Sequence, residues 1–200
     1  MSEYTEGLIK GRIAETIVEE LLRDLGFYVL KLGQENTVNP LVQMKNFITA
    51  CGGKFKLDYN DEPITIIRRL PDFVIVDTKG NVQFLEVKYR EKGYLGEEHL
   101  DVFSYFPTYI VVVSLTIEES YFRRYSLSDS NPMPDEIKKS RFNVWVMREI
   151  EELNAKSVKH AFSVSTIAKW LEDEFDIDVN HEIRDKIHRY ERLVQKWFKK

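Results

Sequence analysis

The chain begins with apolar residues at helical spacing. Over residues 5–25 an apolar side chain recurs every four positions, and Gly26 follows directly. This spacing puts the apolar side chains on one face of a helix, and glycine is common just after a helix end. The pattern predicts an amphipathic helix over residues 5–25, followed by a strand over residues 27–32. The repeating positions are Ile13, Ile17, Leu21 and Leu25.

Three later stretches have the composition of strands. Residues 72–88 contain two β-rich runs around a turn with Gly80, and residues 108–115 are a continuous apolar run. Such a turn predicts an antiparallel hairpin, and a continuous apolar run is typical of a strand buried on both faces. Weaker patterns predict strands at residues 64–69 and 142–147, a short helix and then a strand and turn between residues 33 and 63, helical turns at 97–105 and a loop at 131–136.

After about residue 150 the strand signal ends. Ser163 or Ser165 is placed to cap a helix that carries Ile167 and Leu171, and Asn180 is placed to cap another. The order of elements predicts an α/β fold with a mixed sheet of about four to five strands flanked by helices. We expect residues 1–150 to form this core, with an insertion at about 34–70. Residues 151–200 are then a helical C-terminal extension, helix-turn-helix-like or dimerising.

Composition excludes several classes of protein. In 200 residues, 29 Lys and Arg stand against 33 Asp and Glu, so a net charge of −4 excludes a chain that binds nucleic acid simply by being basic. The single cysteine, Cys51, excludes a disulfide framework and a Cys-rich zinc site. With no long apolar stretch and no apolar segment at the N-terminus, we expect an intracellular (cytoplasmic) protein that is not in a membrane.

The candidate chemistry lies in the predicted hairpin. Folding residues 72–88 about Lys79 and Gly80 pairs residues whose numbers sum to about 158 or 159, which puts Asp72 across from Glu86 or Val87. Glu86 and Lys88 point to the same face, because side chains alternate along a strand. Two carboxylates and one ammonium are therefore expected at one end of the hairpin. A surface Glu–Lys salt bridge is the plain alternative.

Two neighbouring carboxylates repel each other, and a divalent cation removes that conflict. Oxygen ligands of this kind suit Mg²⁺ or Mn²⁺ rather than zinc. Such an ion polarises a phosphodiester and lowers the pKa of a bound water. Lys88 is then placed to orient or help deprotonate the attacking water, or to stabilise the developing negative charge.

These residues resemble a known family. Pro71-Asp72 followed by Glu86-Val87-Lys88 on a hairpin is similar to the PD-(D/E)xK nuclease superfamily. The run from Gly11 to Glu15, followed by Gly26-Phe27, is similar to the opening of archaeal Holliday-junction resolvase-like endonucleases. The resemblance implies a restriction-endonuclease-like core and a metal-dependent endonuclease that hydrolyses DNA, branched DNA among its candidate substrates. It implies Glu15, Asp72, Glu86 and the Val87 carbonyl as metal ligands, and Lys88 as the catalytic lysine together with Asp72 and Glu86.

Nucleic acid is expected to bind through basic and aromatic residues near this site. The candidates are Arg68, Arg69, Tyr89, Arg90 and Lys92. Their alternative role is that of solvated loop residues. The enzyme is expected to be a homodimer, because cutting two strands needs two sites. A DNA-binding or assembly module that does not cleave, and an RNA nuclease, remain alternatives.

Overall fold

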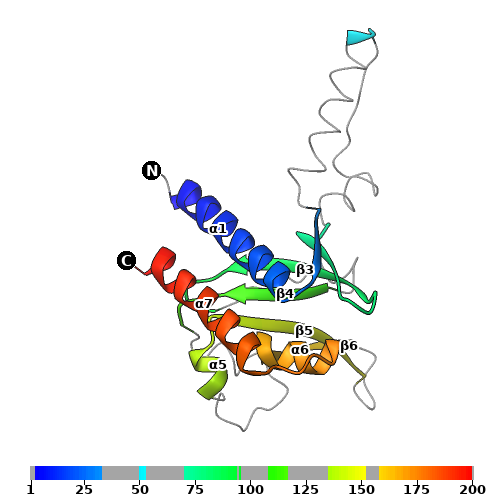
Figure 1. Ribbon diagram of the computed structural model, residues 1–200. Coiled ribbons are helices and arrows are strands. Elements are labelled where there is room, and N and C mark those ends of the chain that lie inside the picture. The colour runs from blue at the N-terminus through cyan, green and yellow to red at the C-terminus, as the bar shows by residue number, and fades with distance from the viewer. Residues whose placement is uncertain are drawn as a thin grey trace.

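The computed structural model describes residues 3–32, 50–52, 70–93, 95, 108–116, 135–151 and 158–199. In these ranges the chain forms one six-stranded mixed sheet with helices packed against it (Figure 1). The strands lie in the order β1-β2-β3-β4-β5-β6, and every neighbouring pair is antiparallel except β3 and β4. The α/β class with a mixed sheet is confirmed, and the sheet has six strands rather than the four to five expected.

The first helix and strand lie where the apolar spacing predicts them. Helix α1 spans Glu3–Asp24, and β1 spans Tyr28–Lys31. Gly26 joins them with a φ of 94°, a conformation that glycine adopts without the steric penalty of a Cβ atom. The N–H of Phe27 closes the helix end by donating to the Leu22 carbonyl at 3.0 Å.

The predicted hairpin is also present. Strand β2 (Phe73–Val76) pairs with β3 (Val82–Tyr89). The turn between them is held by Asp77, whose side chain accepts hydrogen bonds from the N–H groups of Lys79 and Asn81 at 2.9 and 2.8 Å. Strand β4 (Thr108–Val113) then runs parallel to β3, at the place of the continuous apolar run.

The C-terminal quarter differs from the prediction. After the short helix α5 (Asp135–Lys139), strand β5 (Phe142–Glu151) extends past the boundary expected at residue 150, and β6 (Val158–Thr166) pairs with it. The expectation that strands end near residue 150 is therefore wrong. Residues 163 and 165 lie in β6, and Thr166 caps helix α6 (Ile167–Phe175) by accepting a hydrogen bond from the Lys169 N–H.

The last helix confirms its predicted cap. Helix α7 (His181–Phe198) begins after Asn180, whose side chain accepts a hydrogen bond from the Ile183 N–H at 3.1 Å. Helices α1, α6 and α7 lie over one face of the sheet and share one hydrophobic core with it (Figure 1). At one end of this layer Asp24 of α1 accepts hydrogen bonds from Arg189 and Tyr190 of α7 at 2.5 and 2.6 Å.

The two faces of the sheet differ because side chains alternate along each strand. Leu85, Val87 and Val111 point to the face that carries the helices. Glu86 and Lys88 therefore point to the opposite face. On β4 and β5 that opposite face is deeply buried, as Ile110 and Trp145 show.

The expectations for residues 33–49, 53–69, 97–105 and 131–134 lie outside the described residues. They include the predicted strand at 64–69 and most of the insertion at 34–70. Within the described ranges, no helix is both long enough and apolar enough to cross a membrane.

Candidate functional site

The open end of the β2–β3 hairpin brings Asp72 and Glu86 together. Phe73 pairs with Leu85 in the antiparallel ladder. The next residues outward, Asp72 and Glu86, therefore face each other, as the turn position predicts. The Asp72 N–H donates to the Glu86 carboxylate (Oε2) at 3.1 Å, and the Val87 N–H donates to the Asp72 carboxylate (Oδ2) at 2.8 Å. Each carboxylate is thus positioned by the backbone of the facing strand.

Lys88 completes this group. Its ammonium (Nζ) forms an ion pair with the other oxygen of the Glu86 carboxylate (Oε1). The Glu86 side chain is 12% exposed and that of Lys88 is 27% exposed, so the pair is largely withdrawn from water but still accessible. The predicted Glu–Lys contact on one strand face is present, and it lies beside a second carboxylate rather than alone on the surface.

Asp72 carries an unfavourable charge in this arrangement. Burial and the neighbouring charge of Glu86 raise the pKa of Asp72 to about 7, against the smaller opposite effects of Lys88, the Val87 N–H and Arg12. Burial acts to lower the pKa of Lys88, but Glu86 and Asp72 together outweigh it, and the pKa of Lys88 is raised. Lys88 is therefore protonated at neutral pH, while Asp72 lies near the middle of its titration.

Helix α1 supplies the predicted glutamate at the edge of its buried face. The Glu15 side chain is 15% exposed and accepts a hydrogen bond from the guanidinium of Arg12 at 3.2 Å. Arg12 is 52% exposed on its side chain, and its charge acts on Asp72 as well. Arg12 thus connects Glu15 electrostatically with the hairpin carboxylates. No motif of the sequence points to Arg12 as a functional residue, although its position three residues before Glu15 is the spacing of a helical ion pair.

Some of the predicted metal ligands are placed to hold a hard divalent cation, and Glu15 is not. In the described part of the chain, no three His, Cys, Asp or Glu side chains are arranged to hold a metal ion, so Glu15 is not in place beside Asp72 and Glu86. The two hairpin carboxylates fit such an ion, because a cation would relieve the repulsion that raises the pKa of Asp72. The Val87 N–H points to Asp72, and the N–H and C=O of one strand residue point to the same side. By strand geometry the Val87 carbonyl therefore lies on the side of β3 that faces Asp72.

The residues predicted to bind nucleic acid are less clearly placed. Arg68 and Arg69 lie outside the described residues. The ring of Tyr89 stacks on Phe198 of α7, with 4.1 Å between ring centroids, and Lys10 lies over the Tyr89 ring at 5.8 Å. Tyr89 therefore packs the end of α7 against the sheet.

The two basic residues after Tyr89 follow the end of β3. Arg90 is half-buried, and its guanidinium donates to the Tyr89 carbonyl at 2.7 Å. Lys92 is exposed. Of the five predicted contacts, these two remain the cations closest in sequence to Lys88.

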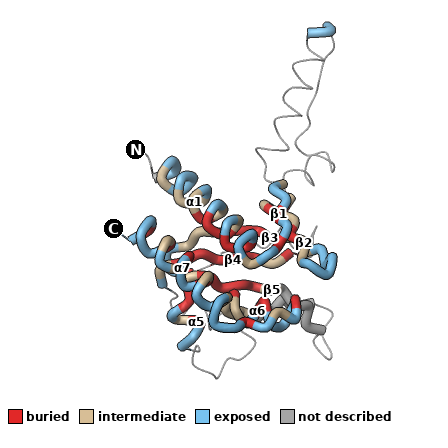
Figure 2. The backbone as a smooth tube through the Cα atoms, viewed as in Figure 1, coloured by how far each residue is buried: buried red, intermediate tan, exposed pale blue. Residues whose placement is uncertain are grey.

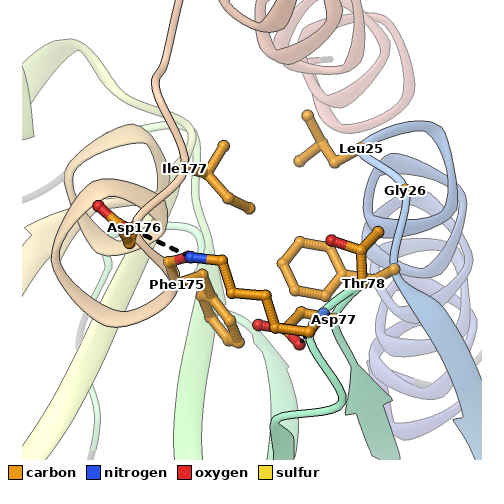
Figure 3. A pocket seen from close by; sticks show the side chains of 9 residues that line it. Leu25, Gly26, Asp77, Thr78, Phe175, Asp176 and Ile177 are labelled. Carbon is orange, nitrogen blue, oxygen red and sulfur yellow. Dashed lines mark hydrogen bonds and ion pairs between the residues drawn. The ribbon is translucent and has the colours of Figure 1, made fainter.

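A pocket of about 230 Å³ lies at the other end of the hairpin (Figure 3). It is lined by the β2–β3 turn, the loop after α1 and the end of α6. Lys79, one of the residues that line the pocket, forms an ion pair with Asp176 at 3.1 Å. Both charged side chains are more than half exposed, so this hollow has no buried polar group comparable with Asp72 and Glu86.

Comparison of the chain with models of protein families, with curated proteins and with solved structures finds no match. The arrangement of Asp72, Glu86 and Lys88 at the open end of the hairpin is therefore the feature that points to a function.

Proposed function

We propose that the protein is a metal-dependent endonuclease that hydrolyses DNA phosphodiester bonds, with a restriction-endonuclease-like core. One observation carries the proposal: Asp72, Glu86 and Lys88 meet at a partly buried hairpin end, where the pKa of Asp72 is raised to about 7. A carboxylate with a perturbed pKa beside a charged lysine is typical of catalytic sites. The mixed sheet flanked by helices is the architecture that the sequence resemblance implies.

The cation expected at this site is Mg²⁺ or Mn²⁺. Asp72, Glu86 and the Val87 carbonyl would hold it, and Glu15 of α1 is the further ligand that the sequence resemblance implies. When bound, such an ion polarises the phosphate and makes a nearby water more acidic.

The protein's own groups have separate tasks. Lys88 is protonated, so it is suited to orient the attacking water and to stabilise negative charge that develops on the phosphate. The Asp72 N–H and the Lys88 ammonium fix the two oxygens of Glu86. The Val87 N–H fixes Asp72 in the same way. Positioning by backbone groups keeps both carboxylates in one geometry while the substrate binds.

A cleavage panel tests the proposal. Duplex, single-stranded, flap and four-way-junction DNA and an RNA strand are incubated with the full chain in Mg²⁺ or Mn²⁺. We expect cleavage of at least one DNA substrate. Lys88→Met should lower the cleavage rate 100-fold or more, which is on the order of the contribution of one catalytic group. Lys79→Met is the matched control, because Lys79 lies on the same hairpin at the far end and is 54% exposed. Equal cleavage by these two variants would refute the assignment, and cleavage of RNA alone would replace DNA as the substrate.

Calorimetry with Mn²⁺ separates an enzyme from a scaffold that only binds DNA. The intact protein should bind Mn²⁺, and Glu86→Gln should lose most of that binding. Glu20→Gln, an exposed change on α1, should bind Mn²⁺ as the unmodified chain does. Absence of Mn²⁺ binding in the unmodified chain, together with DNA binding, would identify a module that does not cleave. The proposed homodimer is tested separately by light scattering, where a monomer at high concentration would exclude it.

A further inference from the structure

The sheet face that carries Glu86 and Lys88 is covered on one side of these residues and open on the other. On the β4 and β5 side, Ile110, Val112 and Trp145 are each at most 1% exposed. On the β1 and β2 side, Tyr28 and Leu30 are 62% and 43% exposed. The candidate site therefore lies at the border between the two halves.

The open half is apolar. The strand register places six side chains in two rows that cross β1, β2 and β3. These six side chains form the open apolar face. The first row is Tyr28, Val76 and Val82, and the second is Leu30, Val74 and Phe84. In Figure 2 most of β1, at this edge of the sheet, has the colour of exposed residues. No charged side chain belongs to either row.

The size of this surface argues against a second copy of the chain as its occupant. An aromatic side chain has roughly 200 Å² of surface, so Tyr28 exposes roughly 120 Å², and the whole open apolar face exposes roughly 300 to 450 Å². A stable dimer needs about 800 Å² from each partner, of which about 500 Å² is apolar, so this face alone falls short of a homodimer interface. The surface is nevertheless large enough to be functional, since an apolar patch of this size marks a binding site on many monomers. The proposed homodimer would need a different surface.

The open apolar face continues directly into the candidate site. Phe84 is two residues before Glu86 on the same side of β3, so their side chains are neighbours. Tyr28 is two strands away and four residues back, which is roughly 16 Å from Glu86 by strand geometry. The ammonium of Lys88 lies at the site end of this face, and the Lys88 side chain is 27% exposed. One ligand would thus meet an apolar surface along its length and positive charge at one end.

A single nucleic-acid strand has this chemistry. Unpaired bases present flat apolar faces that stack on aromatic rings, and the phosphates need cations. In a duplex the base faces are already stacked on one another, so they are not available to stack on the open apolar face. We propose that the open apolar face binds unpaired nucleotides next to the phosphodiester held at Glu86 and Lys88, with Tyr28 as the main stacking residue. This inference rests on the proposed function, because it assigns that site a substrate with a single-stranded segment.

Binding in EDTA tests the inference without cleavage. A labelled single-stranded DNA and a duplex of the same sequence are titrated with the full chain, and fluorescence anisotropy gives both dissociation constants. Stacking of a base on an aromatic ring accounts for about 5- to 150-fold in affinity, so Tyr28→Ala should weaken single-strand binding by about tenfold or more. Duplex binding should change by less than about twofold, and Tyr28→Phe, which keeps the ring, should bind as the unmodified chain does.

Tyr4→Ala is the matched control, because Tyr4 is a tyrosine of α1 that is 77% exposed and lies away from the open apolar face. It should leave both affinities unchanged. The inference is overturned if Tyr28→Ala binds single strands as Tyr4→Ala does, or weakens duplex binding equally. It is also overturned if light scattering shows that Tyr28→Ala converts a dimer to a monomer, since the face would then hold a second copy. Failure of the proposed function would appear instead as Glu86→Gln retaining full cleavage, which leaves the Tyr28 comparison intact.

Discussion

Replacing Asp72 with asparagine should stabilise the protein at alkaline pH while abolishing its proposed activity. The asparagine side chain keeps an oxygen that can accept the Val87 N–H, but it removes the negative charge beside Glu86. The charge is costly in the folded chain, because burial and Glu86 raise the pKa of Asp72 from 3.8 to about 7. Asparagine has no such cost at any pH.

The magnitude follows from the linkage between proton binding and folding. The folded chain binds the Asp72 proton more tightly than the unfolded chain does, so stability from this group is greatest below pH 3.8 and is lost as the pH rises to about 7. Each pKa unit corresponds to about 1.4 kcal/mol, so the complete loss is ~4 kcal/mol. Asp72→Asn should not show this loss of stability, because asparagine does not ionise. Its free energy of unfolding relative to the unmodified chain should therefore rise by ~3 to 4 kcal/mol between pH 4 and pH 8.

Urea denaturation at pH 4 and pH 8 in EDTA measures this difference. EDTA removes divalent cations, which would otherwise offset the repulsion between the carboxylates. Other titrating groups are shared by the two proteins and cancel in the comparison. An equal stability difference at both pH values would refute the argument that Asp72 carries an unfavourable charge. Adding excess Mn²⁺ at pH 8 should stabilise the unmodified chain more than Asp72→Asn, since only the former keeps both carboxylates.

Other predictions address the core, a helix cap and the third carboxylate. Trp170→Ala should destabilise the chain by about 3 to 5 kcal/mol, because Trp170 is 1% exposed, whereas Trp197→Ala at a 60% exposed position should cost less than ~0.5 kcal/mol; thermal or urea unfolding measures both. Thr166→Ala should cost about 1 kcal/mol through the lost cap of α6, and no change in unfolding free energy would contradict that role. Glu15→Gln should reduce metal-dependent cleavage by tenfold or more, on the order of one ligand's contribution, while Glu20→Gln cleaves normally; equal rates would remove Glu15 from the site.

The hairpin and its carboxylates were predictable because their geometry is local. The turn at Lys79 and Gly80 sets the register, and the register alone places Asp72 opposite Glu86. The α1 helix was predictable for the same reason, since its apolar spacing is contained in one segment. Strand β6 was missed because a polar segment precedes it and it has no continuous apolar run.

Contacts between distant segments were beyond sequence reasoning. The stacking of Tyr89 on Phe198 joins residues more than 100 positions apart, and it gives Tyr89 a packing role where nucleic-acid binding was expected. The partner of Glu15 was missed although Arg12 is close in sequence, because an exposed arginine on a helix has several possible partners. The open apolar face depended on the register of three strands and on what covers them, and neither is visible in a single segment.

The contact between α1 and α7 has a consequence for how the chain folds. Asp24 and Arg189 are 165 positions apart, so this contact closes most of the described chain into one loop. Closing a loop of that length costs roughly 4 to 5 kcal/mol of chain entropy, which must be offset by burial of both helices together. Folding should therefore be slow for the size of the chain, because the entropy of closing the long loop is lost before the contacts between distant residues contribute stability. Unfolding should be cooperative, with the two helices leaving the sheet in one step.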